Sequence, residues 1–260
     1  MLKKLLKYDL KAIGNSLFPI YGITIALAVL ARIFIEIENI SAVFRMPTGL
    51  VAGLSILLTI ALPFVTFIVG IDRFNKQTAK DEGYLTHTLP VKKSTIIGSK
   101  LITQTLFEVL AMIVVFVSIC ILGNISFKDI KDLIDAIFEI FAEYKVLTPI
   151  LFMLIALAGY AVTTLLVYTA ISFGQRHTTN KGKFAILYGV ILYVAQQCIT
   201  ALVFTPLLRD ESFISELEKT LPSATVLNIS LGISLGVIVV TAICYFIITT
   251  KNFEKKLNLE

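Results

Sequence analysis

A long stretch without a charged residue, residues 147–173, reads LTPILFMLIALAGYAVTTLLVYTAISF. The hydrocarbon core of a bilayer is about 30 Å thick, and an α-helix needs about 20 residues to cross it. A strand of a membrane barrel would instead alternate polar and apolar residues over about ten positions. This stretch does not alternate, so it predicts one transmembrane helix.

The chain contains five further apolar stretches of similar length. Each is expected to be a helix, because a helix satisfies all its backbone hydrogen bonds within one segment in lipid. Together they predict six spans at about 17–37, 50–71, 101–122, 147–173, 184–208 and 226–250. The whole chain is 57% hydrophobic and 16% charged, whereas soluble domains are about 25% charged. These values exclude a water-soluble enzyme and predict an all-α integral membrane protein that forms a single transmembrane domain over residues 1–260.

The basic residues predict how the chain is oriented. The chain has 23 Lys and Arg residues. Of these, 16 lie in four segments on one side of the spans, namely before residue 17, at 72–100, at 174–183 and after residue 250, and the remaining 7 belong to the opposite side. Because loops rich in Lys and Arg stay in the cytoplasm, both termini are expected there, in a multi-pass protein of the cell membrane. The alternative, that the first apolar stretch is a cleaved signal peptide, is weakened because this stretch is long for one.

Amphipathic segments lie beside the spans. Residues 1–16 carry lysines four apart and an apolar sector, which predicts an inner interfacial helix lying flat on anionic lipid. Residues 124–146 combine an apolar stripe with an acidic face, which predicts an outer interfacial helix. A shorter outer amphipathic piece is expected at 210–221. The outer helices could cap an exit or be simple surface helices.

The inner segment 72–100 contains the distinctive sequence GYLTHTLPVKKSTIIGSK at 83–100. With six spans and an amphipathic N-terminus, it resembles the permease subunits of ABC type-2 transporters, especially those of Gram-positive bacteria. Lys92 departs from the resemblance, because many relatives have Ser or Thr there. The matching residues are Gly83, Tyr84, Leu85, Thr88, Leu89, Pro90, Val91, Lys93, Ile96, Ser99 and Lys100.

The resemblance implies that 72–100 is a coupling loop, which docks on a cytoplasmic ATPase and transmits its closure to the spans. It also implies two ATPase subunits, a second permease chain that is identical or homologous, and export. The docking contacts carried over from the resemblance are Phe74, Asp81, Glu82, Tyr84 and Leu85.

The chain carries no phosphate loop, because Gly182-Lys183 is followed by Phe184 without an earlier Gly or a final Ser or Thr. We therefore expect no enzyme activity and no cofactor in this chain, with ATP and magnesium bound by the partner ATPase. A serine-nucleophile pattern at 232–236 falls within a span, where a nucleophile elbow would not form. The three cysteines lie in spans without ligand partners, so we expect no metal site. The inner loops account for the net charge of +5, so no nucleic-acid partner is expected.

Polar groups within spans are expensive in lipid and usually face a cavity or a partner. Candidates for a substrate path or gate are Gln104, Glu108, Tyr193, Gln196 and Gln197. A packing role, in which Glu108 is protonated or hydrogen-bonded to a neighbouring helix, remains the alternative. Small residues that could let helices approach closely are Gly49, Gly53, Gly232 and Gly236.

The leading hypothesis is thus the membrane subunit of an ATP-driven exporter for an amphipathic peptide, drug or lipid-like substrate. A sensor or immunity protein that transports nothing is the second hypothesis, and it would need no ATPase. A secondary carrier is the third, although ion coupling usually needs more charge within the membrane than one Glu.

Overall fold

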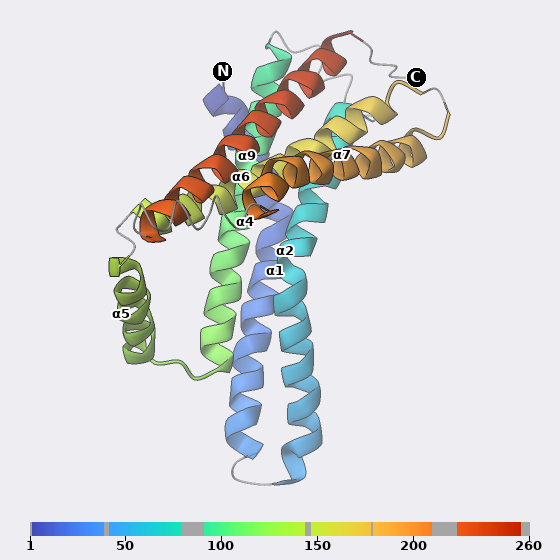
Figure 1. Ribbon diagram of the computed structural model, residues 1–260. Coiled ribbons are helices and arrows are strands. Elements are labelled where there is room, and N and C mark those ends of the chain that lie inside the picture. The colour runs from blue at the N-terminus through green and yellow to red at the C-terminus, as the bar shows by residue number, and fades with distance from the viewer. Residues whose placement is uncertain are drawn as a thin grey trace. The chain divides into compact units, whose positions relative to one another are not determined.

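The computed structural model describes residues 2–38, 42–79, 91–143, 147–177, 179–209 and 223–255. Within these ranges the chain is helical and contains no strand (Figure 1). The helices are α1 (Leu2–Glu38), the short 3-10 helix η1 (Ala42–Phe44), α2 (Arg45–Ala79), α4 (Lys93–Leu122), α5 (Phe127–Glu143), α6 (Leu147–Gly174), α7 (Lys181–Arg209) and α9 (Ser223–Lys255).

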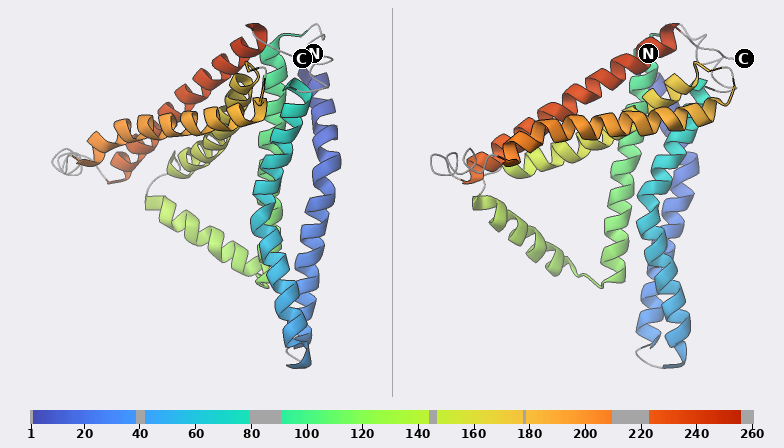
Figure 2. Two further views of the ribbon diagram at one scale, coloured as in Figure 1. Left: turned by 90° about the vertical axis from the view of Figure 1, so that its right-hand side faces the viewer. Right: turned by 45° about the vertical axis from the view of Figure 1, so that its right-hand side comes forward.

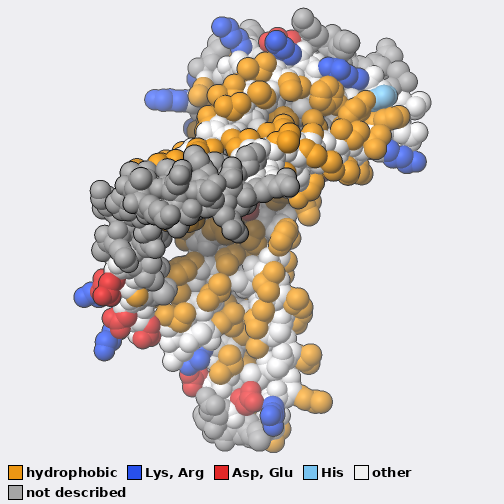
Figure 3. Space-filling view, viewed as in Figure 1, with side chains coloured by type: hydrophobic (Ala, Val, Ile, Leu, Met, Phe, Trp, Pro, Cys, Tyr) orange, Lys and Arg blue, Asp and Glu red, His pale blue; other side chains and the backbone are white. Residues whose placement is uncertain are grey.

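Six of these helices are long and apolar enough to cross a membrane, namely α1, α2, α4, α6, α7 and α9. Each contains one of the six predicted apolar stretches, so the all-α class and six helices of sufficient length and hydrophobicity to span a membrane are confirmed. On the face of the molecule drawn in Figure 3, apolar side chains are spread over the described helices. Such broad apolar exposure is typical of helices that face lipid. The chain is thus a multi-pass membrane protein.

Helix α1 differs from the expectation, because it runs without interruption through Leu2–Glu38. The sequence predicts a flat interfacial helix that turns into the first span near residue 17. Pro19 lies inside α1 and removes a backbone donor there, which favours a bend. Buried residues Ile13, Gly14 and Leu17 nevertheless continue the face that is formed further along by Tyr21 and Thr24. Packing along this continuous face holds the two segments in one helix.

The expected coupling loop 72–100 is largely helical where the structure describes it. Helix α2 continues to Ala79, and α4 begins at Lys93. Both helices therefore extend beyond the apolar stretches by several residues, at about 1.5 Å per residue. Residues 80–90 lie outside the described residues, as does the expected outer piece at 210–221.

Although the sequence groups all six spans in one domain, the helices pack as two compact units. The first unit comprises Met1–Arg73 and Gly98–Ile134, and the second comprises Phe74–Ile97 and Asp135–Glu260. Helix α2 changes unit between Arg73 and Phe74, near its C-terminal end, and α4 changes unit between Ile97 and Gly98, near its N-terminal end.

In the first unit, α1, α2 and α4 pack around one apolar cluster. The cluster contains Ile13, Leu17, Tyr21, Leu62, Phe107, Ala111 and Val114. Both views in Figure 2 show α1 and α2 running side by side over much of their length. The edge of the Phe107 ring meets Phe18, with the ring centroids 5.9 Å apart. The three helices thus form a bundle with its own core.

In the second unit, α6 packs against both α7 and α9. The Thr169 and Thr249 hydroxyls are 2.8 Å apart and join α6 to α9. The Thr148 hydroxyl donates to Asn228 Oδ1 at 2.8 Å near the other end of the same pair. Hydrogen bonds between small polar side chains are a common attachment between membrane helices.

Helix α5 begins with a capping box. The Ser126 backbone N–H and hydroxyl donate to Asp129 Oδ2 at 2.8 and 2.7 Å. In return, the Asp129 N–H donates to Ser126 Oγ at 3.3 Å. These reciprocal bonds satisfy donors that the first turn of a helix leaves open. The predicted helix is therefore present, while its expected position at the outer interface stays a prediction.

Candidate functional site

The middle of the first unit holds a polar centre among its apolar neighbours. The Tyr21 hydroxyl of α1 donates to the Phe107 carbonyl of α4 at 3.0 Å. The same oxygen lies 3.1 Å from Thr66 Oγ1 of α2. Because a phenol has one proton, the Thr66 hydroxyl is the donor in this second bond. One side chain thus joins all three helices.

Two of the predicted path residues lie beside this centre. Gln104 is 1% exposed, and its Nε2 donates to the Thr66 carbonyl at 3.4 Å. Glu108 is 6% exposed and lies within electrostatic reach of Tyr21. The structure therefore brings Gln104 and Glu108 together with Tyr21 and Thr66 inside one bundle.

Gly70 makes room for Gln104. A Cβ atom at position 70 would lie 1.4 Å from Gln104 Oε1, which is far closer than any van der Waals contact. Only glycine allows the amide to lie so close to the α2 backbone. This close contact between Gln104 and Gly70, which we call the cradle, is absent from the sequence-based predictions, because a single Gly in an apolar stretch does not indicate which side chain packs against it.

An enclosed group of this kind can position helices, and it can bind a substrate only if the bundle opens. Buried hydrogen-bonded side chains restrict a membrane bundle to one register, because shifting a helix would leave polar groups in an apolar medium. The arrangement favours the packing role for Gln104 and Glu108 in this conformation. Their role in a substrate path stays a prediction.

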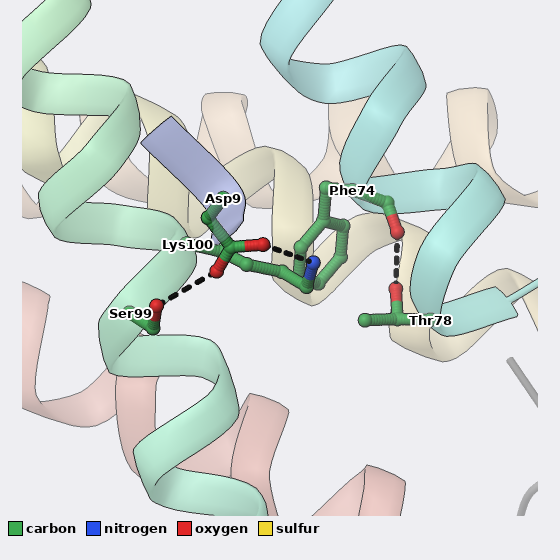
Figure 4. Close-up of polar contacts among 5 residues, drawn as sticks. All are labelled: Asp9, Phe74, Thr78, Ser99 and Lys100. Atoms are coloured by element: carbon green, nitrogen blue, oxygen red, sulfur yellow. Dashed lines mark hydrogen bonds and ion pairs between the residues drawn. The ribbon is translucent and has the colours of Figure 1, made fainter. Parts of the chain in front are cut away.

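A second polar contact of the first unit lies near the predicted inner ends of α1 and α4 (Figure 4). The Ser99 hydroxyl donates to Asp9 Oδ2 at 2.7 Å, and Lys100 Nζ lies 3.5 Å from Asp9 Oδ1. The Asp9 and Lys100 side chains are only 15% and 9% exposed. We call this group the Asp9 clamp, because each carboxylate oxygen contacts its own partner on α4.

The C-terminal end of α2 carries Phe74, the one predicted ATPase contact that the structure describes. Its ring is 1% exposed and stacks on Tyr168 with the centroids 3.5 Å apart. The edge of Phe253 meets it at 5.9 Å. The Thr78 hydroxyl donates to the Phe74 carbonyl, which stabilises this last turn (Figure 4). Phe74 therefore packs within its own unit, and the four other predicted contacts, Asp81, Glu82, Tyr84 and Leu85, lie outside the described residues.

The remaining path candidates lie on α7 in the second unit. Tyr193 is 56% exposed and Gln197 is also exposed. Gln196 is partly buried, and its Oε1 accepts a hydrogen bond of 3.4 Å from the Tyr245 hydroxyl of α9. No residue in the Lys181–Val203 part of α7 is buried. The five path candidates thus fall into one enclosed group and one exposed group, in different units.

The C-terminal end of α6 carries a further polar group that sequence reasoning missed. Asn252 of α9 donates to Ser172 Oγ at 2.9 Å and accepts a hydrogen bond from Arg176. His177 stacks on Phe184 with the centroids 3.7 Å apart, and its Nε2 lies 3.2 Å from the Tyr188 hydroxyl. These contacts fix the turn between α6 and α7.

The predicted packing glycines make no close approach to another helix within the part of the chain that the structure describes. A Cβ at Gly49, Gly53, Gly232 or Gly236 would meet no other atom within 4 Å. The close approach in the second unit occurs instead at Gly174, where a Cβ would lie 2.7 Å from the Lys181 carbonyl oxygen. Contact of the four glycines with another chain stays a prediction.

The described residues contain no group of three or more His, Cys, Asp or Glu side chains that could hold a metal ion. Cys120, Cys198 and Cys244 are all free thiols. Comparisons of the chain with family models, with curated proteins and with solved structures give no match.

Proposed function

We propose that this chain is the membrane subunit of an ATP-driven ABC exporter, and that segment 72–100 receives the motion of a separate ATPase. The resemblance of 83–100 to ABC type-2 permeases motivates the proposal. The six candidate spans and the basic residues of the predicted inner side agree with it. Two ATPase subunits and a second permease chain would complete the transporter, with ATP and magnesium on the ATPases.

One structural observation carries the proposal furthest. Helices α2 and α4 flank residues 80–92, and each continues from one packing unit into the other. A helix transmits displacement along its axis because its backbone hydrogen bonds make it stiff. A force applied between the two helices therefore reaches both units without passing through a loop.

Contacts within each unit support the same mechanism. Phe74 attaches the end of α2 to α6 and α9 through Tyr168 and Phe253. Ser99 and Lys100, the last two residues of the resemblance, attach α4 to α1 through Asp9. The segment that would meet the ATPase thus begins and ends beside side chains that are packed in place.

The substrate class follows from composition alone. The described helices expose many large apolar side chains, and an amphipathic peptide, drug or lipid suits such surfaces better than an ion or a sugar.

Purification in mild detergent tests the proposal. We expect an ATP-hydrolysing protein to co-purify with the chain, and the purified chain alone to hydrolyse no ATP. In the reconstituted complex, Glu82→Ala and Tyr84→Ala should abolish substrate-stimulated hydrolysis, while the control Lys183→Gln should keep it. Recovery of the chain without any ATPase, or full activity of both loop variants, would refute the proposal.

A further inference from the structure

The first turns of α1 present two different faces. At about 100° per residue, Lys3, Lys4, Lys7 and Lys11 share one side of the helix, and Asp9 lies on the opposite side. All four lysines are exposed. Asp9 is the only acidic residue before Glu36, so nothing in this segment neutralises the lysine side, which we call the basic face.

The Asp9 clamp directs the other side of α1 toward the protein. Leu5 and Leu6 flank Asp9 on its side of the helix and are partly buried, and Ile13 is buried one turn further on. A helix lying on a membrane would turn these apolar residues to lipid. Here the same side carries the clamp to Ser99 and Lys100, so protein takes the place of lipid.

The length of α1 places the basic face away from the bilayer. Lys3 lies about 21 Å along the axis from Leu17, where the apolar stretch begins, and Lys7 about 15 Å. One headgroup layer is only about 5–8 Å thick. A tilt of 40°, the upper end of the usual range, still leaves Lys3 about 16 Å from the hydrocarbon. With the hydrocarbon taken to begin at Leu17, Lys3 and Lys7 are expected beyond the headgroups.

We infer that the basic face of α1 stands clear of the membrane and is a docking surface for an acidic surface of a cytoplasmic protein. The inference rests on the proposed function in taking the ATPase subunit as that protein. The clamp supplies the reason for this partner, because Asp9 fixes the basic face to the residues that end the coupling segment. One subunit could then contact both elements.

A depth measurement tests the position of the basic face without any ATPase. Single cysteines are introduced as Lys3→Cys, Lys7→Cys and Lys11→Cys in a background with Cys120, Cys198 and Cys244 changed to Ser. Each is labelled with a fluorophore in vesicles of phosphatidylcholine and phosphatidylglycerol that contain headgroup-linked nitroxide quenchers. We expect quenching to fall from position 11 to position 7 and to be weakest at position 3. Strong and equal quenching at all three would overturn the inference and identify the anionic membrane as the partner.

The variant Asp9→Asn tests the clamp in the same assay. Loss of the ion pair should release the first turns, so that the label at position 3 becomes more strongly quenched. The control Asp132→Asn, on α5, should leave it unchanged. Unchanged quenching in Asp9→Asn would overturn the role assigned to Asp9.

A binding experiment tests the partner. Lys3→Gln/Lys7→Gln is compared with Lys183→Gln/Lys251→Gln, which removes two exposed lysines from other inner segments. Because exposed ion pairs contribute little individually, we expect the first variant to bind the ATPase roughly 2- to 10-fold more weakly at low salt and the second to bind normally. Equal affinity of the two variants would overturn the partner assignment. Failure of the wild-type chain to bind any ATPase would instead refute the proposed function, while the depth results would still decide the position of the basic face.

Discussion

The two units of the molecule stabilise their helices differently. The first unit encloses an amide, a carboxyl and a phenol among α1, α2 and α4, and a largely buried ion pair between Asp9 and Lys100 also joins α1 to α4. The second unit joins α6 to α9 through hydroxyl and amide contacts, and α6 contacts α7 as well. No residue in the Lys181–Val203 part of α7 is buried.

The difference shows which helix surfaces are buried against other helices of the same chain and which are left exposed. A polar group enclosed by three helices restricts their register, because displacement would expose it to lipid. The apolar, uncovered surface of α7 imposes no such restriction on its neighbours. We therefore expect substitutions in the polar centre to act on the fold of this chain, and substitutions on the exposed side of α7 to act on contacts outside it.

The largest expected effect is that of Phe74→Ala, which removes the aromatic contacts that join the end of α2 to α6 and α9 within the second unit. Loss of a buried ring should lower the free energy of unfolding by about 3–5 kcal/mol. The control is Phe64→Ala, because Phe64 lies on the same helix and is 67% exposed. Unfolding in mixed micelles with increasing dodecyl sulfate, followed by circular dichroism, measures both. Similar losses in the two variants would show that the Phe74 stack does not attach α2.

The variant Gly70→Ala tests the enclosed polar centre. The new methyl group would displace Gln104 from the Thr66 carbonyl, so we expect a loss of about 1–3 kcal/mol. The control Gly53→Ala lies on the same helix, where a Cβ meets no atom within 4 Å, and should gain stability because Ala favours helix. The same unfolding assay measures both variants. A gain in Gly70→Ala equal to that in Gly53→Ala would contradict the cradle.

Removal of one hydroxyl compares the two units directly. Tyr21→Phe loses bonds of 3.0 and 3.1 Å, and should cost about 1–2 kcal/mol. Tyr245→Phe in the second unit loses two bonds of 3.4 Å, and such long bonds should contribute less than about 0.5 kcal/mol. Thermal unfolding followed by circular dichroism ranks the two variants. The reverse order would show that the second unit depends more on its buried tyrosine than the first.

The smallest effect concerns α5 and pH. The Ser126 side chain and then its backbone N–H, which both donate to Asp129, lower the pKa of this carboxyl below its ordinary value. The contribution of the cap is thus complete above the ordinary Asp pKa and is lost as the pH falls through the lowered pKa. Hydrogen exchange of α5 in wild type relative to Asp129→Asn should show protection at neutral pH that disappears in acid. A ratio that does not change with pH would contradict the cap, and Asp135→Asn is the control.

The sequence predicted the spans well because hydrophobic length is a local property. The stretch 147–173 corresponds to α6 within one residue, and 101–122 lies inside α4 and ends with it. Where a helix continues beyond its apolar stretch, as α2 does to Ala79, hydropathy does not predict where the helix ends. Helix formers such as Lys76 and Gln77 extend the helix into polar sequence without changing the predicted span.

The candidate site was predictable only in part. Gln104 and Glu108 were found because polar groups within an apolar run are conspicuous. Their partners Tyr21, Thr66 and Gly70 were missed, because a Tyr, a Thr or a Gly in a span is ordinary until a neighbouring helix is placed beside it. Asp9 was missed for the same reason, since the sequence pattern of one aspartate among several lysines is typical of a solvent-exposed helix face.

The sequence by itself determined that this protein has six apolar helices long enough to span a membrane, because the free energy of placing a helix in lipid depends on its own residues. The tertiary structure decided which polar residues meet. It placed Tyr21 between Thr66 and Phe107, enclosed Gln104 against Gly70, and joined Asp9 to Ser99 and Lys100. These contacts join residues from 34 to 91 positions apart in the chain, and no local pattern specifies them, because each depends on the packing of a second helix.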